Sequence, residues 1–76
     1  MANYHYHIDN DKLKTYKGEI NEIGKDFRFY EHSSFGEGNL YYKTENKKIT
    51  EIIFETTDSI IYANEKVDEF IENLEL

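Results

Sequence analysis

The chain has 76 residues, enough for one domain and too few for two. It contains no Cys, which excludes disulfides and thiolate metal sites, and this fits a reducing compartment. The longest apolar runs, 52–54 and 60–63, are far shorter than the ~20 residues of a membrane span. No apolar stretch follows Met1, so we expect a cytoplasmic protein without a signal peptide.

The net charge of −7 comes entirely from the last third of the chain. Residues 1–50 contain eight acidic and eight basic side chains, whereas residues 51–76 contain eight acidic side chains and Lys66 as the one basic residue. Direct binding to nucleic acid or to an anionic membrane requires clustered Lys and Arg. We therefore expect neither a nucleic acid nor a membrane as a direct partner.

Alternating polar and apolar residues predict a series of short strands. In the first, residues 3–8, Tyr4 and Tyr6 face one side, whereas His5 and His7 face the other. Further strands are expected at 14–20, 26–32, 40–44 and 49–56, with turn-forming residues between them. Gly18 weakens the second strand or marks a bulge.

Residues 59–63 are ambiguous, because the segment is β-branched enough for a strand yet in phase with the helical pattern that follows. We assign it to a strand, since Asn64 is a suitable N-cap and Glu65 suits the first turn of a helix.

The C-terminal segment has the clearest pattern in the chain. Its apolar residues are spaced at i, i+3, i+4 and i+7, which predicts an amphipathic helix: Val67, Phe70, Ile71 and Leu74. A helix this short is marginal alone in water, so its apolar side must dock on the sheet. The expected fold is one α+β domain over residues 1–76, a small antiparallel sheet or meander of five to six short strands with one C-terminal helix packed on it.

The histidines are the first candidates for metal chemistry. His5 and His7 project from the same side of a strand, a spacing that can serve zinc, and His32, Asp9 or Glu31 would have to supply a third ligand. Metal sites usually have a tighter spacing signature than this. We therefore expect neither a metal nor another cofactor.

Residues that could support catalysis or phosphate binding are sparse. Ser33, Ser34 and Ser59 lie in no recognisable nucleophile motif. The sequence Gly36-Glu37-Gly38 lacks the third glycine and the lysine of a phosphate-binding loop, and reads as a loop in which glycine supplies positive φ. We therefore expect no enzymatic activity.

Acidic residues dominate the outer side of the predicted helix. Glu65, Glu69 and Glu72 are spaced at i, i+4 and i+7, which sets successive carboxylates roughly 5–6 Å apart, a scale comparable to that of DNA phosphates. Neighbouring tyrosines could act as aromatic anchors at an interface. The residues predicted to bind a partner are Glu65, Asp68, Glu69, Glu72, Glu75, Tyr41 and Tyr42.

These features favour a non-enzymatic protein–protein interaction module. In its most concrete form the module is an acidic inhibitor that blocks the basic surface of a nuclease or other nucleic-acid-binding protein. In size and charge the chain resembles small acidic proteins of bacteriophages and mobile elements that inhibit host defence nucleases. One alternative is a structural or oligomerising β-domain that pairs through its sheet edge or its tyrosines. A metal-binding or small-molecule-binding domain is the third reading.

Overall fold

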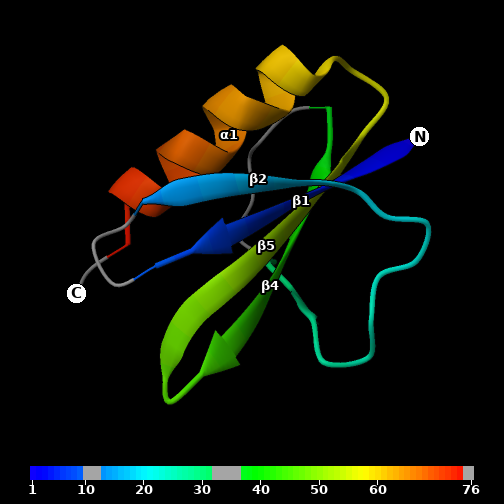
Figure 1. Ribbon diagram of the computed structural model, residues 1–76. Helices are drawn as coiled ribbons and strands as arrows, with labels where there is room; N and C mark the ends of the chain where they lie inside the picture. The colour runs from blue at the N-terminus through cyan, green and yellow to red at the C-terminus, as the bar shows by residue number, and fades with distance from the viewer. Residues whose placement is uncertain (10–12, 32–36, 75–76) are drawn as a thin grey trace.

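The structure, a computed structural model, describes residues 1–9, 13–31 and 37–74. Within them lie one helix and five strands: β1 (Ala2–Ile8), β2 (Lys14–Glu19), β3 (Arg28–Phe29), β4 (Asn39–Glu45), β5 (Lys48–Thr56) and α1 (Ile60–Glu72). The strands form one antiparallel sheet in the order β2-β1-β5-β4-β3, and α1 lies across one of its faces (Figure 1). The predicted α+β fold is confirmed.

The first and last strands pair at the centre of the sheet, so the strand order is not a simple meander. β1 lies between β2 and β5, and Tyr4 and Tyr6 are in register with Phe54 and Ile52 of β5. These four side chains are buried on the face that α1 covers. The alternation predicted for β1 therefore holds, with Tyr4 and Tyr6 towards the core.

The connection between β2 and β3 has to cross the sheet, because these strands form its two opposite edges. Ile20 and Asn3 exchange two hydrogen bonds at the start of the crossing, and the ring of Phe27 lies edge-on to His5 near its end. The crossing therefore runs over the face away from α1. β3 is shorter than the strand predicted over 26–32, of which residue 32 lies outside the described residues. Arg28 and Phe29 pair with β4, and Tyr30 adds one backbone hydrogen bond of 2.9 Å to Leu40.

The strand predicted for residues 59–63 is wrong, because α1 already begins at Ile60. Ser59 is the N-cap instead of Asn64, and its hydroxyl accepts a hydrogen bond of 3.3 Å from the backbone N–H of Tyr62. The earlier start continues the apolar stripe by one turn, because Ala63 is fully buried. Burial on the sheet thus outweighs the local β-preference of these residues.

The chain departs from regular geometry at two turns. Asn46 and Lys47 join β4 to β5 with φ of 53° and 69°, the two positive values that a tight hairpin turn requires. Gly18 has φ of 108° and lies next to a register shift between β1 and β2, so of the two alternatives expected for it, a weakened strand or a bulge, the structure has the bulge.

A buried polar contact fixes the position of α1 on the sheet. The hydroxyl of Tyr6, whose residue is fully buried, donates to Asn64 Oδ1 at 2.7 Å. Lys14 on β2 donates to the backbone oxygen of Asn64 at 3.2 Å, and its ammonium lies 5.5 Å from the centre of the Tyr6 ring. Burial raises the pKa of the Tyr6 hydroxyl well above its ordinary value, so it remains a donor.

Truncation of Phe70 should remove most of the stability of the fold. Phe70 is only 3% exposed and packs edge-on against Tyr30 at 4.9 Å. We expect Phe70→Ala to lower the free energy of unfolding by about 3–5 kcal/mol. Ile61→Ala is the matched control, because Ile61 is on the same helix but 68% exposed. Urea unfolding followed by circular dichroism measures both, and similar midpoints for the two variants would contradict the docking of α1.

Candidate functional site

Four carboxylates lie on the side of α1 that faces away from the sheet. Glu65, Asp68, Glu69 and Glu72 are all exposed, and they form what we call the acidic face. Their neighbours Val67, Phe70 and Ile71 are buried beneath the helix. Glu75, which was predicted to belong with them, lies outside the described residues.

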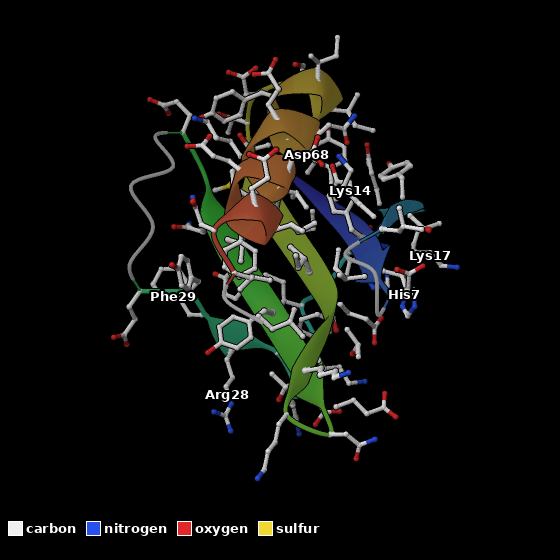
Figure 2. The ribbon with its side chains drawn as sticks, turned by 90° about the vertical axis from the view of Figure 1, so that its left-hand side faces the viewer. His7, Lys14, Lys17, Arg28, Phe29 and Asp68 are labelled. Atoms are coloured by element: carbon white, nitrogen blue, oxygen red, sulfur yellow. The ribbon has the colours of Figure 1, made fainter. Side chains whose placement is uncertain are left out.

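Two of the four carboxylates have basic partners within the fold. Lys14 reaches from β2 to Asp68, with 2.8 Å between Nζ and Oδ1 (Figure 2), and Lys66 lies 3.3 Å from Glu69. Asp68 and Glu69 nevertheless remain 57% and 55% exposed. Glu65 and Glu72 form no ion pair with any residue in the described part of the chain. The acidic face is therefore only partly neutralised.

The position of this charge along α1 opposes the helix dipole. The first turn of α1 has no acidic residue, and the last turn has no basic one. Glu69 and Glu72 instead lie close to the C-terminal end, where negative charge is destabilising by roughly 0.3–1 kcal/mol per residue. Helix stability would favour the reverse arrangement.

An exposed apolar side chain extends the acidic face, and sequence reasoning missed it. Ile61 is 68% exposed and precedes Glu65 by one helical turn. Because residues 59–63 were assigned to a strand, Ile61 was not related to the helix surface. The helical pattern itself was the signal that could have identified it.

The two tyrosines predicted to bind a partner point to opposite sides of the sheet. Tyr42 packs against the core on the side of α1, where its ring lies 6.4 Å from that of Tyr30. Tyr41 faces the other way and pairs with Phe29, with 5.4 Å between the ring centres. Tyr41 and the acidic face therefore cannot form one continuous surface.

A charged cluster occupies the face of the sheet away from α1. His5 Nε2 lies 2.7 Å from Glu51 Oε1, and Lys43 Nζ lies 3.5 Å from Oε2 of the same carboxylate. Burial alone would raise the pKa of Glu51. The hydrogen bond and the charge of His5, together with those of Lys43, lower this pKa by more than burial raises it, so the pKa of Glu51 in the folded protein is below its ordinary value.

The two histidines within the described residues, His5 and His7, have different surroundings. His7 is exposed, His5 is occupied by Glu51, and His32 lies outside the described residues. Across the part of the chain that the structure describes, no three His, Asp or Glu side chains are arranged to hold a metal ion. Ser33 and Ser34 also lie outside that part, and Ser59 caps α1.

Gly38 is required for a different reason from the one that the sequence suggested. Its φ is not positive; a Cβ here would lie 2.6 Å from the Phe54 ring and 2.8 Å from the backbone oxygen of Glu55. Close packing therefore demands glycine at this position, while Gly36 lies outside the described residues.

Comparison of the chain with protein-family models, with curated protein sequences and with solved structures gives no match. Among the described residues, no helix combines the length and apolar character that crossing a membrane requires.

The pH dependence of stability should reveal the Glu51 cluster. A carboxyl whose pKa is lowered by folding contributes stability above its unfolded value of 4.5, and this contribution is lost as the pH falls through the lower folded value. We expect wild type to be more stable than Glu51→Gln at pH 6, and the difference to shrink below about pH 4.5. Urea unfolding of both proteins between pH 3 and 7 measures this, and a constant difference would contradict it.

The two strand histidines should differ in their effect on stability. His5→Ala should cost roughly 1 kcal/mol because Glu51 loses its closest partner, whereas His7→Ala should change little. Neither effect should depend on EDTA, because we expect no bound metal. Thermal unfolding with and without EDTA, combined with metal analysis of protein purified without added zinc, provides the check. Stoichiometric zinc would overturn the expectation.

Proposed function

We propose that this domain is a non-enzymatic interaction module whose acidic face binds the basic surface of another protein. The most concrete form of this function is inhibition of a nuclease or other nucleic-acid-binding protein. The observation that carries the proposal is the gathering of exposed carboxylates towards the C-terminal end of α1, where the helix dipole disfavours them.

The cost of this arrangement supports a functional reading over a purely solubilising one. Carboxylates that only keep a domain soluble are equally effective at positions where they cost no stability. Here Glu65 and Glu69 also repel each other across one helical turn, at roughly 0.2–0.5 kcal/mol. Departures from local stability are expected mainly at functional sites.

The geometry of the acidic face suits a partner that normally binds phosphates. Glu65, Asp68 and Glu72 follow one another along the helix at intervals of three and four residues, or roughly 5–6 Å. Such a row of charge attracts a basic groove and accelerates encounter. Ile61 adds an apolar contact at one end of the row.

Self-association through the sheet edge is the alternative, and the edge itself argues against it. β2 is interrupted by the bulge beside Gly18 and contains Lys14 and Lys17. Bulges and lysines are devices by which edge strands avoid pairing with other chains. At the other edge, β3 offers only two residues.

Charge reversal of the acidic face tests the proposal. Changing Glu65, Glu69 and Glu72 to Lys should preserve the fold and slightly raise its stability, because repulsion and the unfavourable dipole interaction are relieved. Association with the basic partner should be lost, chiefly through a slower on-rate. The measurement is displacement of labelled DNA from a panel of nucleases and other basic DNA-binding proteins, followed by the on-rate against ionic strength.

A matched variant separates position from net charge. Glu22, Asp26 and Glu45 are exposed and lie away from α1, so changing all three to Lys alters the net charge equally. This control should retain binding to any protein from which wild type displaces DNA. Equal binding by both triple variants, or a wild-type on-rate that does not depend on salt, would reject the acidic face as the contact surface.

A further inference from the structure

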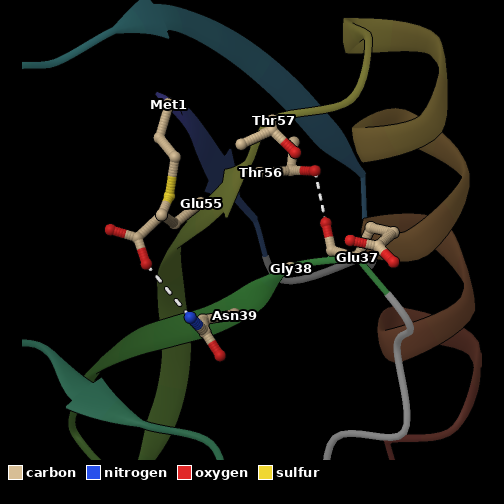
Figure 3. Close-up of a pocket in the computed structure, with 7 residues that line it drawn as sticks. All are labelled: Met1, Glu37, Gly38, Asn39, Glu55, Thr56 and Thr57. Carbon is tan, nitrogen blue, oxygen red and sulfur yellow. Dashed lines mark hydrogen bonds between the residues drawn. The ribbon is translucent and has the colours of Figure 1, made fainter.

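A pocket lies at the end of the sheet where β1 begins, β4 begins and β5 ends. Its volume is about 270 Å³, and it is lined by Met1, Glu37, Gly38, Asn39, Glu55, Thr56 and Thr57 (Figure 3). Asn39 and Glu55 are neighbours across β4 and β5, and their side chains point away from α1, opposite to the buried Leu40 and Phe54. The pocket is therefore separate from the acidic face.

The walls of the pocket are held in place by the fold. Thr56 is 1% exposed; its hydroxyl donates to the backbone oxygen of Glu37 and accepts from the backbone N–H of Asp58 at 3.0 Å. Gly38 is fixed by its close approach to the Phe54 ring. A ligand would thus meet a preformed site, which lowers the ordering cost of binding.

Two carboxylates, Glu37 and Glu55, line the pocket together with Met1, whose α-amino group is the one cationic group of this lining, so the formal charge of the pocket is negative. Asn39 Nδ2 donates to Glu55 Oε1 at 3.1 Å, which orients the carboxylate and leaves Oε2 for a ligand (Figure 3). Neither Glu37 nor Glu55 forms an ion pair with a cation in the described segments.

A buried hydrogen-bond acceptor lies on β1 next to Glu55. Asn3 is in register with Glu55 on the neighbouring strand, and its amide oxygen is buried and accepts no hydrogen bond from any described residue. Buried acceptors in proteins are normally satisfied. Asn3 does not itself line the pocket, so this unpaired acceptor lies next to Glu55 and outside the reach of a ligand in the pocket.

A pair of aromatic rings lies on the same face of the sheet as Glu55, next to the residues that line the pocket. Tyr41 lies two residues beyond Asn39 on β4, with its side chain on the same face, and its ring pairs with Phe29, which is 47% exposed. Burial and the charge of Glu55 both raise the pKa of Tyr41, as expected if its hydroxyl lies near that carboxylate. Planar cations favour such a combination of carboxylate and aromatic ring.

We propose that this pocket binds the guanidinium group of an arginine side chain presented by a partner protein. Guanidinium carries five N–H donors in a plane, pairs with carboxylates through two parallel hydrogen bonds and stacks on aromatic rings. The volume equals that of several water molecules, at about 30 Å³ each, and is far larger than a metal ion needs. The pocket does not use the acidic face, so this inference and the proposed function can fail separately.

The test is a titration of ¹⁵N-labelled domain with the peptide Ac-Gly-Arg-Gly-NH₂, followed by NMR. Saturable shifts should appear at the amides of Gly38, Asn39, Glu55 and Thr57, and at the Asn39 side chain. The same peptide with citrulline, which has the shape of arginine without its charge, should give no saturable shifts. Shifts confined to α1, equal shifts with citrulline, or no saturable shifts would each overturn the pocket while leaving the proposed function standing.

Single substitutions of the carboxylates test which of them contacts the arginine peptide. Glu55→Gln should weaken the arginine peptide by about tenfold or more, the loss expected for a hydrogen bond to a charged partner. Glu37→Gln is a second, more exposed variant that should also weaken binding without disturbing the sheet. Glu45→Gln, at the opposite end of β4, is the matched control and should bind as wild type does. Unchanged affinity in both Glu55→Gln and Glu37→Gln would reject the assignment.

Discussion

Docking of α1 across β1, β5 and β4 is the contact that holds both layers of this small molecule in place. A 13-residue helix is marginal on its own in water, and a sheet with one large apolar face needs a cover. Val67 and Phe70 supply that cover above Tyr6 and Phe54, and all four are buried. Because the chain has no cysteine, no disulfide can replace this packing.

The same contact determines which charges the molecule presents to its surroundings. The bond from Tyr6 to Asn64 fixes the rotation of α1 on the sheet, and this rotation turns Glu65 and Glu72 outward. Lys14 affects both the position of α1 and its surface charge, since it donates to the backbone oxygen of Asn64 and neutralises Asp68. Lys66 pairs with Glu69 in addition, so the fold pairs two carboxylates of the acidic face and leaves Glu65 and Glu72 without an internal ion pair among the described residues.

Much of the fold could be predicted because buried residues that face α1 alternate with more exposed ones along β1, and the apolar residues of α1 recur with the helical period. The alternation in 3–8 identified the core side of β1, and the spacing from Val67 to Leu74 identified the buried side of α1. The start of α1 was missed because Ile60 and Ile61 favour a strand locally, while the burial of Ala63 depends on the sheet beneath it. The pairing of β1 with β5 is a long-range contact that no local pattern encodes.

The acidic face and the pocket also differ in how far they could be predicted from the sequence. The acidic face could be predicted since its carboxylates recur with the helical period, and periodicity is visible in the sequence. The pocket could not, because Met1, Glu37 and Glu55 are far apart in the chain and meet only when β1, β4 and β5 pair. Tyr41 and Tyr42 were both expected to contact a partner, and the alternation of a strand already indicated that they face opposite sides, as they do in β4.

The distribution of ion pairs separates the acidic residues that stabilise the fold from those that remain available. Glu51 on β5 meets His5 and Lys43 from the two neighbouring strands, and Asp68 on α1 meets Lys14 from β2. Glu65 and Glu72 on α1, and Glu55 at the pocket, do not meet one within the described residues. A domain of this size has a stability of only about 5–15 kcal/mol, so unfavourable charge at several positions is a substantial fraction of the total. Such a sequence is maintained more readily if a cationic partner offsets the repulsion on binding, which is the physical link between the charge of this chain and the surfaces proposed for it.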